Sequence, residues 1–331
     1  MAALPAAGQE KPDVGKVFAE LRQYDDGKEM RPLRTIEMLV ARSTAEPKAR
    51  GEMADRLAAV LADEKASLAA RRFACGQLAL VASDAHVPLL AKLLGDPQLT
   101  EAARRALAAI PGAAAGAALR KALAKLKGPE LVGLINSLGD RRDAEAVGAL
   151  DGLLGGLDLA LANAAATALG KIGTAEAAER LDRANTRADV RALQDARLRC
   201  AEHLAAAGNR AAAAGLYRQL AESSGAVEWR VAGLMGLAKA AADDCLPLVV
   251  EALAADNTEL RGAALRAARE LPGAKATAGL AAAIEKIRPE AQALLIGVLA
   301  DRGDRSAAAA VTRRLDDKQD AVRIAAVRAM A

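Results

Sequence analysis

The stretch PEAQALLIGVLADRG, residues 289–303, shows the pattern that decides the fold of this chain. Its apolar residues share one helical face: Ala291, Leu294, Leu295, Val298 and Leu299. Their spacing of i, i+3, i+4, i+7 and i+8 is that of an amphipathic α-helix. Gly303 follows the last apolar position, where a glycine is typical of a left-handed helix cap. The stretch therefore predicts a helix with one buried face, followed by a turn.

The same ending recurs along the chain. A Leu or Ile followed by a glycine-containing turn is found at Ile110, Leu138, Leu169, Leu204, Leu271 and Leu299. Consecutive anchors are 28, 31, 35, 67 and 28 residues apart, and the longest step covers two repeats with Leu237 near its midpoint. A period of about thirty residues is one helix–turn–helix unit. No stretch shows the alternation typical of a β-strand. The sequence predicts an all-α chain of about ten stacked helix pairs.

Composition agrees with a core of small and aliphatic side chains. Hydrophobic residues make up 53% of the 331 residues but aromatic residues only 2%, so Ala, Leu, Val and Ile must fill the interior. Trp229, the only Trp, is predicted to pack between repeat units. The net charge is +4 with acids and bases interleaved, which argues against a nucleic-acid binder. No apolar run approaches the ~20 residues of a membrane span.

The turn inside each helix pair also recurs. DDKQDAVR (residues 316–323) resembles DDGKEMR (residues 25–31), and residues 96–104 and 256–261 are variants. An Asp here is expected to cap the second helix, and an Arg in that helix is expected to pair with the Asp of a neighbouring unit. Stacked units would then carry a ladder of Asp–Arg pairs beside the apolar core.

The recurring pattern resembles the HEAT repeat. It consists of an Asp, a short spacer, Val-Arg and then an Ala/Leu-rich helix that ends in Leu-Gly. The resemblance is strongest to the short bacterial form, which is also found in phycobilisome lyase subunits. It covers residues 13–331, although residues 208–220 (GNRAAAAGLYRQL) are more similar to the first helix of a tetratricopeptide repeat. It implies a right-handed α–α superhelix, a HEAT-like solenoid. It implies no activity, because unrelated functions share this repeat.

The predicted organisation has two parts. Residues 1–12 are expected to be a disordered start or the remnant of a trimmed export signal, because small residues cluster there. Residues 13–331 are expected to form a single solenoid. The last helix carries Val322, Ala326 and Met330 without a capping glycine. We therefore expect the solenoid to be truncated at its C-terminal end and to associate end to end through this uncapped repeat. The sequence does not decide whether the protein is cytoplasmic or exported.

The sequence offers no recognisable catalytic chemistry. His86 and His203 are the only two histidines, too few for a three- or four-ligand metal site without several carboxylates. Cys75, Cys200 and Cys245 are widely spaced and are interpreted as small buried apolar residues. No nucleophile elbow or phosphate-binding loop is found. We therefore predict no catalytic residue, no metal, no cofactor and no enzymatic activity.

Several arginines are candidates for ligand contacts. Arg197 falls inside the apolar face of the helix predicted over residues 190–204, where it must be paired. On the same helix Arg199 and His203 point away from the stack. The predicted groove contacts are Arg199, His203, Arg266, Arg269 and Arg328, which would form a basic strip if second helices line the concave surface. The alternative interpretation is an ordinary solvated charged face.

The leading functional interpretation is a non-catalytic scaffold or adaptor that binds a protein or peptide along the concave groove. One alternative is a lyase-associated or enzyme-accessory module similar to bilin lyase subunits. The other is a binder of an anionic ligand or nucleic acid through the groove arginines. The sequence does not identify the partner.

Overall fold

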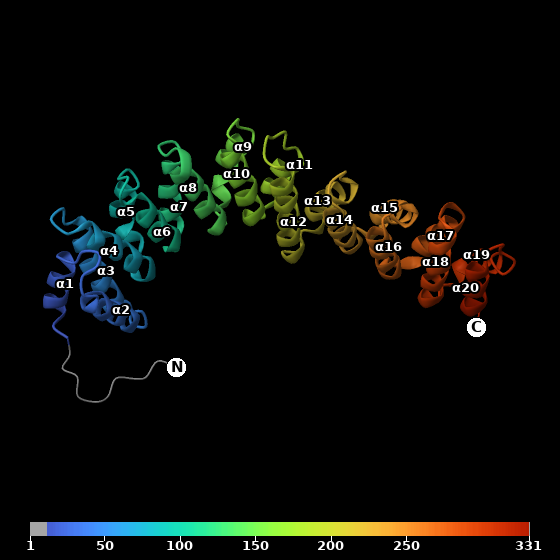
Figure 1. Cartoon of the computed structure of the whole chain (residues 1–331), viewed down its shortest axis with the longest axis horizontal. Helices are drawn as coiled ribbons and strands as arrows, with labels where there is room; N and C mark the ends of the chain where they lie inside the picture. Colours follow the sequence, from blue (N-terminus) through green and yellow to red (C-terminus); the bar gives the residue numbers. More distant parts are fainter. Residues whose placement is uncertain (1–11, 331) are drawn as a thin grey trace, which may run out of the picture. The chain divides into compact units, whose positions relative to one another are not determined.

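All regular structure in the described part of the chain is helical (Figure 1). The computed structural model describes residues 12–330, which form twenty α-helices and four short 3-10 helices and contain no strand. The prediction of an all-α fold is confirmed. The chain divides into unit 1, which ends at Ala146, and unit 2, which begins at Val147. The predicted single solenoid over residues 13–331 stays a prediction, and the segment expected over residues 1–12 lies, apart from its last residue, outside the described residues.

Unit 1 contains four complete helix pairs. The first helices of these pairs are α1 (Val14–Arg22), α3 (Pro47–Ala62), η1 (Asp84–His86) with α5 (Val87–Leu93), and α7 (Ala113–Ala122). The second helices are α2 (Arg31–Ser43), α4 (Leu68–Val81), α6 (Thr100–Ala109) and α8 (Gly128–Asp140). The short η2 (Ala144–Ala146) follows. The second helices contact one another in succession and form one layer, while α5 and α7 contact each other in the other layer.

Unit 2 contains six helix pairs. The first helices are α9 (Val147–Leu154), α11 (Ala175–Asp182), α13 (Arg210–Glu222), α15 (Ala242–Ala254), α17 (Gly273–Ala283) with η3 (Ile284–Lys286), and η4 (Arg305–Ala307) with α19 (Ala308–Thr312). The second helices are α10 (Leu159–Ile172), α12 (Val190–Ala206), α14 (Val227–Ala240), α16 (Thr258–Glu270), α18 (Pro289–Arg302) and α20 (Asp320–Met330). Each second helix contacts the next. Residues 12–330 thus hold ten pairs, as predicted.

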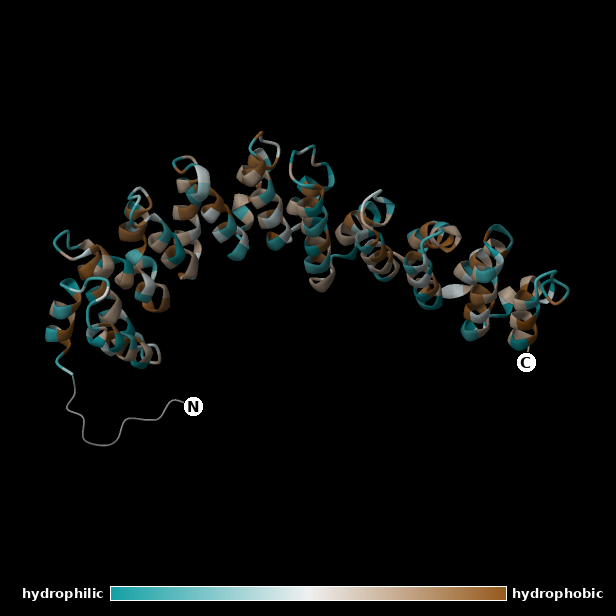
Figure 2. Cartoon of the chain, viewed as in Figure 1, coloured by the Kyte–Doolittle hydropathy of each residue, from teal (hydrophilic) through white to brown (hydrophobic). Residues whose placement is uncertain are grey.

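The core of each unit lies between its two layers of helices. Hydrophobic and hydrophilic residues are interspersed along the helices, and many of the turns are hydrophilic (Figure 2). Leu295 and Val298 of α18 are fully buried, as the periodicity predicted. Leu294 was predicted to share this face, but 55% of its surface is exposed. Val190, at the start of α12, is 63% exposed. The face predicted for α18 was therefore too wide by one position, because the neighbouring helices cover a narrower stripe of its surface.

Arginines bind backbone carbonyls at turns inside several pairs, and they occur beside the predicted Asp–Arg pairs between neighbouring units, such as Arg288 with Asp256 and Arg269 with Asp301. Arg261 donates to the carbonyls of Ala255 and Asp256 at 2.7 and 2.8 Å. Arg323 binds the Asp317 carbonyl in the same way at 2.8 Å. The cap of α16 is the Asn257 side chain, which accepts from Leu260 N at 2.9 Å. The arginine therefore satisfies carbonyls that the end of the first helix leaves unpaired.

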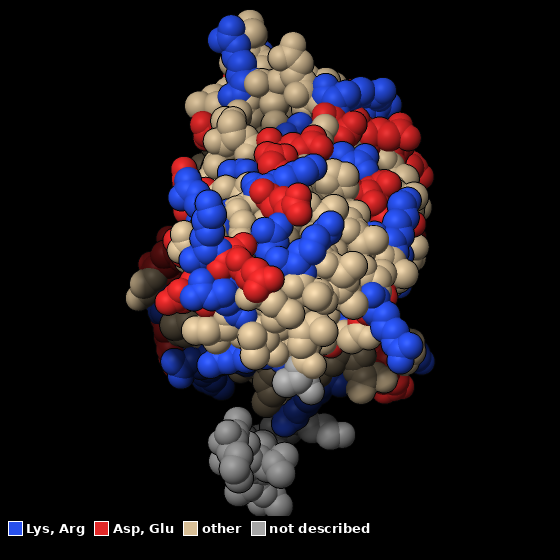
Figure 3. Space-filling view, turned by 90° about the vertical axis from the view of Figure 1, so that its right-hand side faces the viewer, with Lys and Arg blue, Asp and Glu red and all other residues tan. Residues whose placement is uncertain are grey.

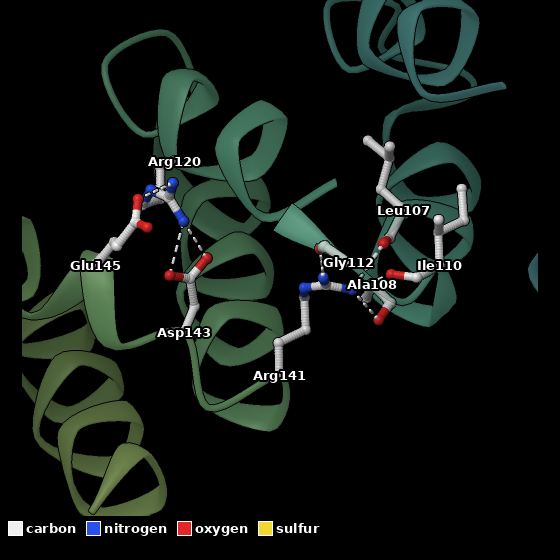
Figure 4. A network of polar contacts seen from close by, with 8 residues as sticks. All are labelled: Leu107, Ala108, Ile110, Gly112, Arg120, Arg141, Asp143 and Glu145. Carbon is white, nitrogen blue, oxygen red and sulfur yellow. Dashed lines mark hydrogen bonds and ion pairs between the residues drawn. The ribbon is translucent and has the colours of Figure 1, made fainter. Parts of the chain in front are cut away.

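A longer arginine bridge joins consecutive pairs, and it occurs in both units. Arg141, at the end of α8, donates from Nη1 to the Ala108 and Ile110 carbonyls at 2.9 and 2.5 Å and from Nη2 to Gly112 O at 2.7 Å (Figure 4). In unit 2, Arg302 binds the carbonyls of Arg269, Leu271 and Gly273. The separations of 33, 31 and 29 residues are the same in both. We call each arrangement an arginine clamp.

Glycine makes the clamped turn possible. Gly112 and Gly273 follow Ile110-Pro111 and Leu271-Pro272, and their φ angles are +98° and +85°. L-residues rarely adopt this region, so the turn that presents its carbonyls to the arginine requires glycine. Beyond the clamp in unit 1, Arg120 of α7 forms an ion pair with Asp143 at 2.5 Å (Figure 4). Both contacts fix α7 against α8.

Loss of a clamp is expected to be costly. In Arg141→Gln, the carbonyls of the turn before α7 lose their charged donor, and hydrogen bonds to charged groups contribute roughly 1.5–3 kcal/mol each. We expect the free energy of unfolding, measured by urea titration, to fall by about 2 kcal/mol, and Arg302→Gln to do the same in unit 2. Arg56→Gln on α3 is the control, because Arg56 is exposed. Equal midpoints for all three variants would contradict a structural role for the clamp.

Candidate functional site

The five predicted groove contacts all lie on second helices of unit 2. Arg199 and His203 are on α12, Arg266 and Arg269 on α16, and Arg328 on α20. Arg199, Arg266, Arg269 and Arg328 are exposed, whereas His203 is half-buried. The structure thus places all five on the second helices of unit 2. Whether they contact a ligand stays a prediction.

The five differ in how free their side chains are. Arg269 pairs with Asp301 at 3.2 Å. The His203 side chain packs over Gly173, where an added β-carbon would lie 2.6 Å from His203 Cβ. Arg199, Arg266 and Arg328 form no ion pair or hydrogen bond within residues 12–330. Two of the five residues therefore have structural contacts, and three present a free guanidinium to solvent.

Arg199 lines a pocket of about 390 Å³ between α10 and α12. Thr167 of α10 and Arg191, Asp195 and Ala196 of α12 complete most of its wall. Next to it, Trp229 of α14 donates from Nε1 to Asp195 Oδ1 at 3.0 Å, and its ring lies against Gly225. Trp229 thus links two repeat units, as predicted. The result is a shallow surface that combines an anchored indole with a free arginine, which we call the α12 surface.

Arg197 has a structural role. Its Nε and Nη2 donate to the Leu181 carbonyl at 3.1 and 3.0 Å, at the end of α11. Burial lowers the pKa of the Arg197 guanidinium, and the nearby Asp182 opposes this shift. Arg197 is half-buried and paired, as predicted, but its partners are mainly carbonyls rather than a carboxylate.

A second cleft lies in unit 1, and none of the predicted groove contacts lines it. It has a volume of about 760 Å³ and is bounded by α5, α7 and the turns that follow them. Five charged residues line it: Lys92, Lys121, Lys125, Lys127 and Glu130. None of the four lysines forms an ion pair within the described residues. We call this feature the lysine cleft. Its sequence signal is the Lys-x-x-x-Lys-x-Lys pattern over residues 121–127, which net charge alone conceals.

Charge elsewhere is distributed differently. On the side of the molecule drawn in Figure 3, Lys and Arg alternate with Asp and Glu. Many arginines are occupied by clamps and ion pairs, as with Arg180 and Asp151 at 3.0 Å. A set of four unpaired lysines around one cleft therefore stands out from the general pattern.

The histidines and acids do not gather into a metal-binding group. Within residues 12–330, no cluster of three or more His, Cys, Asp or Glu side chains is placed to hold a metal ion. His86 is buried, and its Nδ1 and Nε2 contact Ser83 and Asp55, the latter at 3.2 Å. His86 therefore packs as a capping residue at η1.

The three cysteines are buried, as predicted, and burial raises their thiol pKa values. The pKa is about 12 for Cys75 and Cys200 and about 11 for Cys245, against an ordinary value of 9.0. Because the reactive form is the thiolate, these thiols are expected to react slowly in the folded protein.

This gives a pH prediction. Below pH 9 the thiols are protonated in both states, so their contribution to stability is fully present. As the pH rises from 9 toward 11 or 12, the unfolded chain loses these protons and the folded chain keeps them, so the free energy of unfolding falls. We expect a thiol reagent at pH 8 to label native protein far more slowly than protein in urea. Equal labelling rates would contradict the burial of all three thiols.

Comparisons with known proteins give fold likenesses only. No protein-family model and no curated protein sequence matches the chain. Among solved structures, human deoxyhypusine hydroxylase in complex with glycerol is 20% identical, with a TM-score of 0.34 over 75% of this chain and 95% of that one. The complex of CpcE and CpcF of phycocyanin lyase from Nostoc is 20% identical, with a TM-score of 0.35 over 74% and 93%. Kap121p is 10% identical, with a TM-score of 0.43 over 96% of this chain and 45% of its own length.

Within residues 12–330, ten successive helix pairs are stacked in two layers in each unit, which is a HEAT-like fold. The tetratricopeptide-like character of residues 208–220, now α13, stays a prediction. In the described chain, no helix combines the length and the apolar character needed to cross a bilayer.

The prediction that this chain has no enzymatic activity is contradicted. The solved structures that it resembles include a hydroxylase and a lyase by name, so helix pairs of this kind are also found in enzymes. The error came from treating missing motifs as evidence against catalysis. Likenesses at these TM-scores show fold alone and assign no reaction to this chain.

Proposed function

We propose that this protein binds a protein or peptide partner through the second helices of unit 2, with the α12 surface at the centre of the contact. The observation that carries the proposal is that Asp195, which accepts from the Trp229 indole, lines the same pocket as the unpaired Arg199. Protein interfaces are enriched in Trp and Arg, and these residues contribute a large share of binding energy when a partner excludes water around them.

Two later second helices of unit 2 carry further arginines of this kind. Arg266 on α16 and Arg328 on α20 are also exposed and unpaired. Because Arg269 is held by Asp301 and His203 packs on Gly173, we leave these two out of the proposed contact. A row of consecutive second helices offers a continuous platform, which suits an extended partner segment.

The test is a quantitative capture from the source cells with the tagged protein and two triple variants. One removes Arg199, Arg266 and Arg328, each changed to Ser. The other changes Arg183, Lys275 and Arg313 to Ser, which alters the net charge equally at exposed positions off the second helices.

We expect partners that the wild-type and control proteins retain to be lost from the first variant, and Trp229→Ala to lose the same partners. A pattern of captured proteins that is the same for all four baits would overturn the proposed surface. An absence of captured proteins with every bait would overturn the proposed function.

A further inference from the structure

The lysine cleft in unit 1 is independent of the α12 surface, since no residue is shared. We infer that it is a docking site for an acidic amphipathic segment of a partner protein, in which Asp or Glu residues flank aliphatic side chains. The argument rests on the charge of the rim, the character of the floor and the way in which this chain uses its other basic residues.

The rim is cationic and unpaired. Lys92 lies in the last turn of α5 and Lys121 in the last turn of α7, and Lys125 and Lys127 follow in the turn before α8. Only Glu130 opposes them in the lining, which gives a local charge of +3 against +4 for the whole chain. Asp96, in the neighbouring turn, already accepts from Gln98 N at 2.9 Å. The cleft therefore concentrates positive charge that the rest of the molecule balances.

The choice of lysine is itself informative. The chain contains 32 Arg and 14 Lys, yet all four basic residues of the lining are Lys. Arginine serves this fold as a structural donor, in the clamps and at the helix ends, because its planar fork binds several carbonyls at once. Lysine is a mobile point charge on a flexible stem. Four lysines without a structural partner are free to pair with the anionic groups of a bound ligand.

The floor is apolar. It is formed by Pro88 and Ala91 of α5, Leu94 after it, Ala118 and Ala122 of α7, and Leu126. A simple solvated lysine cluster would need no such floor, and burial of aliphatic side chains here would contribute about 25 cal/mol for each Å² removed from water. The volume of about 760 Å³ accommodates several side chains of a docked segment.

Together, rim and floor select the class of ligand. A single-stranded nucleic acid would be expected to stack its bases on aromatic residues, and no aromatic residue lines the cleft. An inorganic anion would leave the apolar floor unused. A peptide that alternates carboxylates with Leu or Ile matches both parts at once, and charge complementarity would favour rapid association.

The arrangement of helices keeps the cleft in shape. Both walls are the ends of first helices, α5 and α7, which contact each other. The ion pair of Arg120 with Asp143 and the clamp of Arg141 on Gly112 hold α7 at its two ends (Figure 4). The cleft is therefore preformed on rigid elements, which lowers the entropy cost of binding.

The test uses the full chain and three fluorescein-labelled twelve-residue peptides measured by fluorescence anisotropy. The first peptide alternates pairs of Glu residues with pairs of Leu residues. The second has Gln in place of each Glu, and the third has Gly in place of each Leu. Lys121→Gln combined with Lys125→Gln is the cleft variant. Lys48→Gln combined with Lys65→Gln is the matched control, because both residues are exposed in unit 1, outside the cleft lining.

We expect the Glu–Leu peptide to bind wild-type and control proteins, and to bind the cleft variant at least about tenfold more weakly, the loss of two charge contacts. The Glu→Gln and Leu→Gly peptides should both bind poorly. Reversal of the charges, with Lys121→Glu and Lys125→Glu, should transfer the preference to a Lys–Leu peptide.

Carbodiimide coupling of the bound peptide, followed by mass spectrometry, locates the contact. We expect new amide bonds between peptide carboxylates and Lys92, Lys121, Lys125 or Lys127. Three results would overturn the inference: an affinity weaker than about 1 mM for the Glu–Leu peptide, equal weakening by the cleft and control variants, or coupling mainly at Lys48 and Lys65. Equal affinity for the Glu–Gly peptide would also overturn it and would assign the cleft to simple anions.

Discussion

Leu295→Asp is expected to destabilise the protein by about 4 kcal/mol or more, while Leu294→Asp costs less than about 1 kcal/mol. The two leucines are neighbours on α18, but Leu295 is fully buried and Leu294 is 55% exposed. A carboxylate at position 295 would be removed from water without a partner, and burial of an unpaired charge carries a large free-energy cost. At position 294 the same carboxylate stays hydrated.

The measurement is chemical denaturation, with hydrogen exchange to locate the damage. In a chain of repeats each pair contacts mainly its neighbours, so protection should fall first in α16, α18 and α20, which contact one another in succession. Helices α2 and α4 in unit 1 should keep their protection. A uniform rise in exchange from residue 14 to residue 330 would contradict nearest-neighbour coupling, and equal costs for the two variants would contradict the orientation of α18.

Gly236→Ala and Gly215→Ala are expected to change stability in opposite directions. Alanine is the better helix former by about 1 kcal/mol, and both glycines lie inside helices, α14 and α13. At Gly236 an added β-carbon would lie 2.6 Å from Tyr217 Cζ and closer still to two other ring atoms. At Gly215 no atom lies within 4 Å of the added carbon.

We therefore expect Gly236→Ala to cost roughly 1–3 kcal/mol, because α13 and α14 must move apart. Gly215→Ala should add about 0.5–1 kcal/mol by removing freedom from the unfolded chain. Thermal unfolding followed by circular dichroism at the helix band measures both. A rise in melting temperature for Gly236→Ala would show that the Tyr217 ring moves aside without cost.

The sequence predicted the helix pairs because their signal is local. Periodic apolar residues and a glycine after Leu299 lie within a few turns of one another, so the helix and its end can be recognised without any tertiary information. The width of the buried face cannot be recognised this way. Leu294 and Leu295 have equal hydropathy, and only the position of the neighbouring helices leaves one of them in water.

The sites were predicted less well, for a related reason. Arg199 and Arg266 were proposed as contacts because they lie opposite an apolar stripe, which is again a local property, and their role stays a prediction. The lysine cleft joins Lys92 to Lys121, which are 29 residues apart on consecutive repeats, so it arises only when α5 and α7 pack together. The arginine clamp is non-local in the same sense, although the paired Pro-Gly turns before α7 and α17 were visible in the sequence.

The two clamps also define a splice point. Arg141 and Arg302 are 161 residues apart, and each lies at the end of the second helix of its pair. The carbonyls that each arginine binds lie at the same sequence separations before it. A chain that joins Asp140 directly to Arg302 would lose five pairs, yet Arg302 would meet the Ile110 and Gly112 carbonyls in register. Such a chain is expected to fold as a shorter array. Gene rearrangements that add or remove blocks of this length would then change how many pairs the protein has without breaking any joint between them.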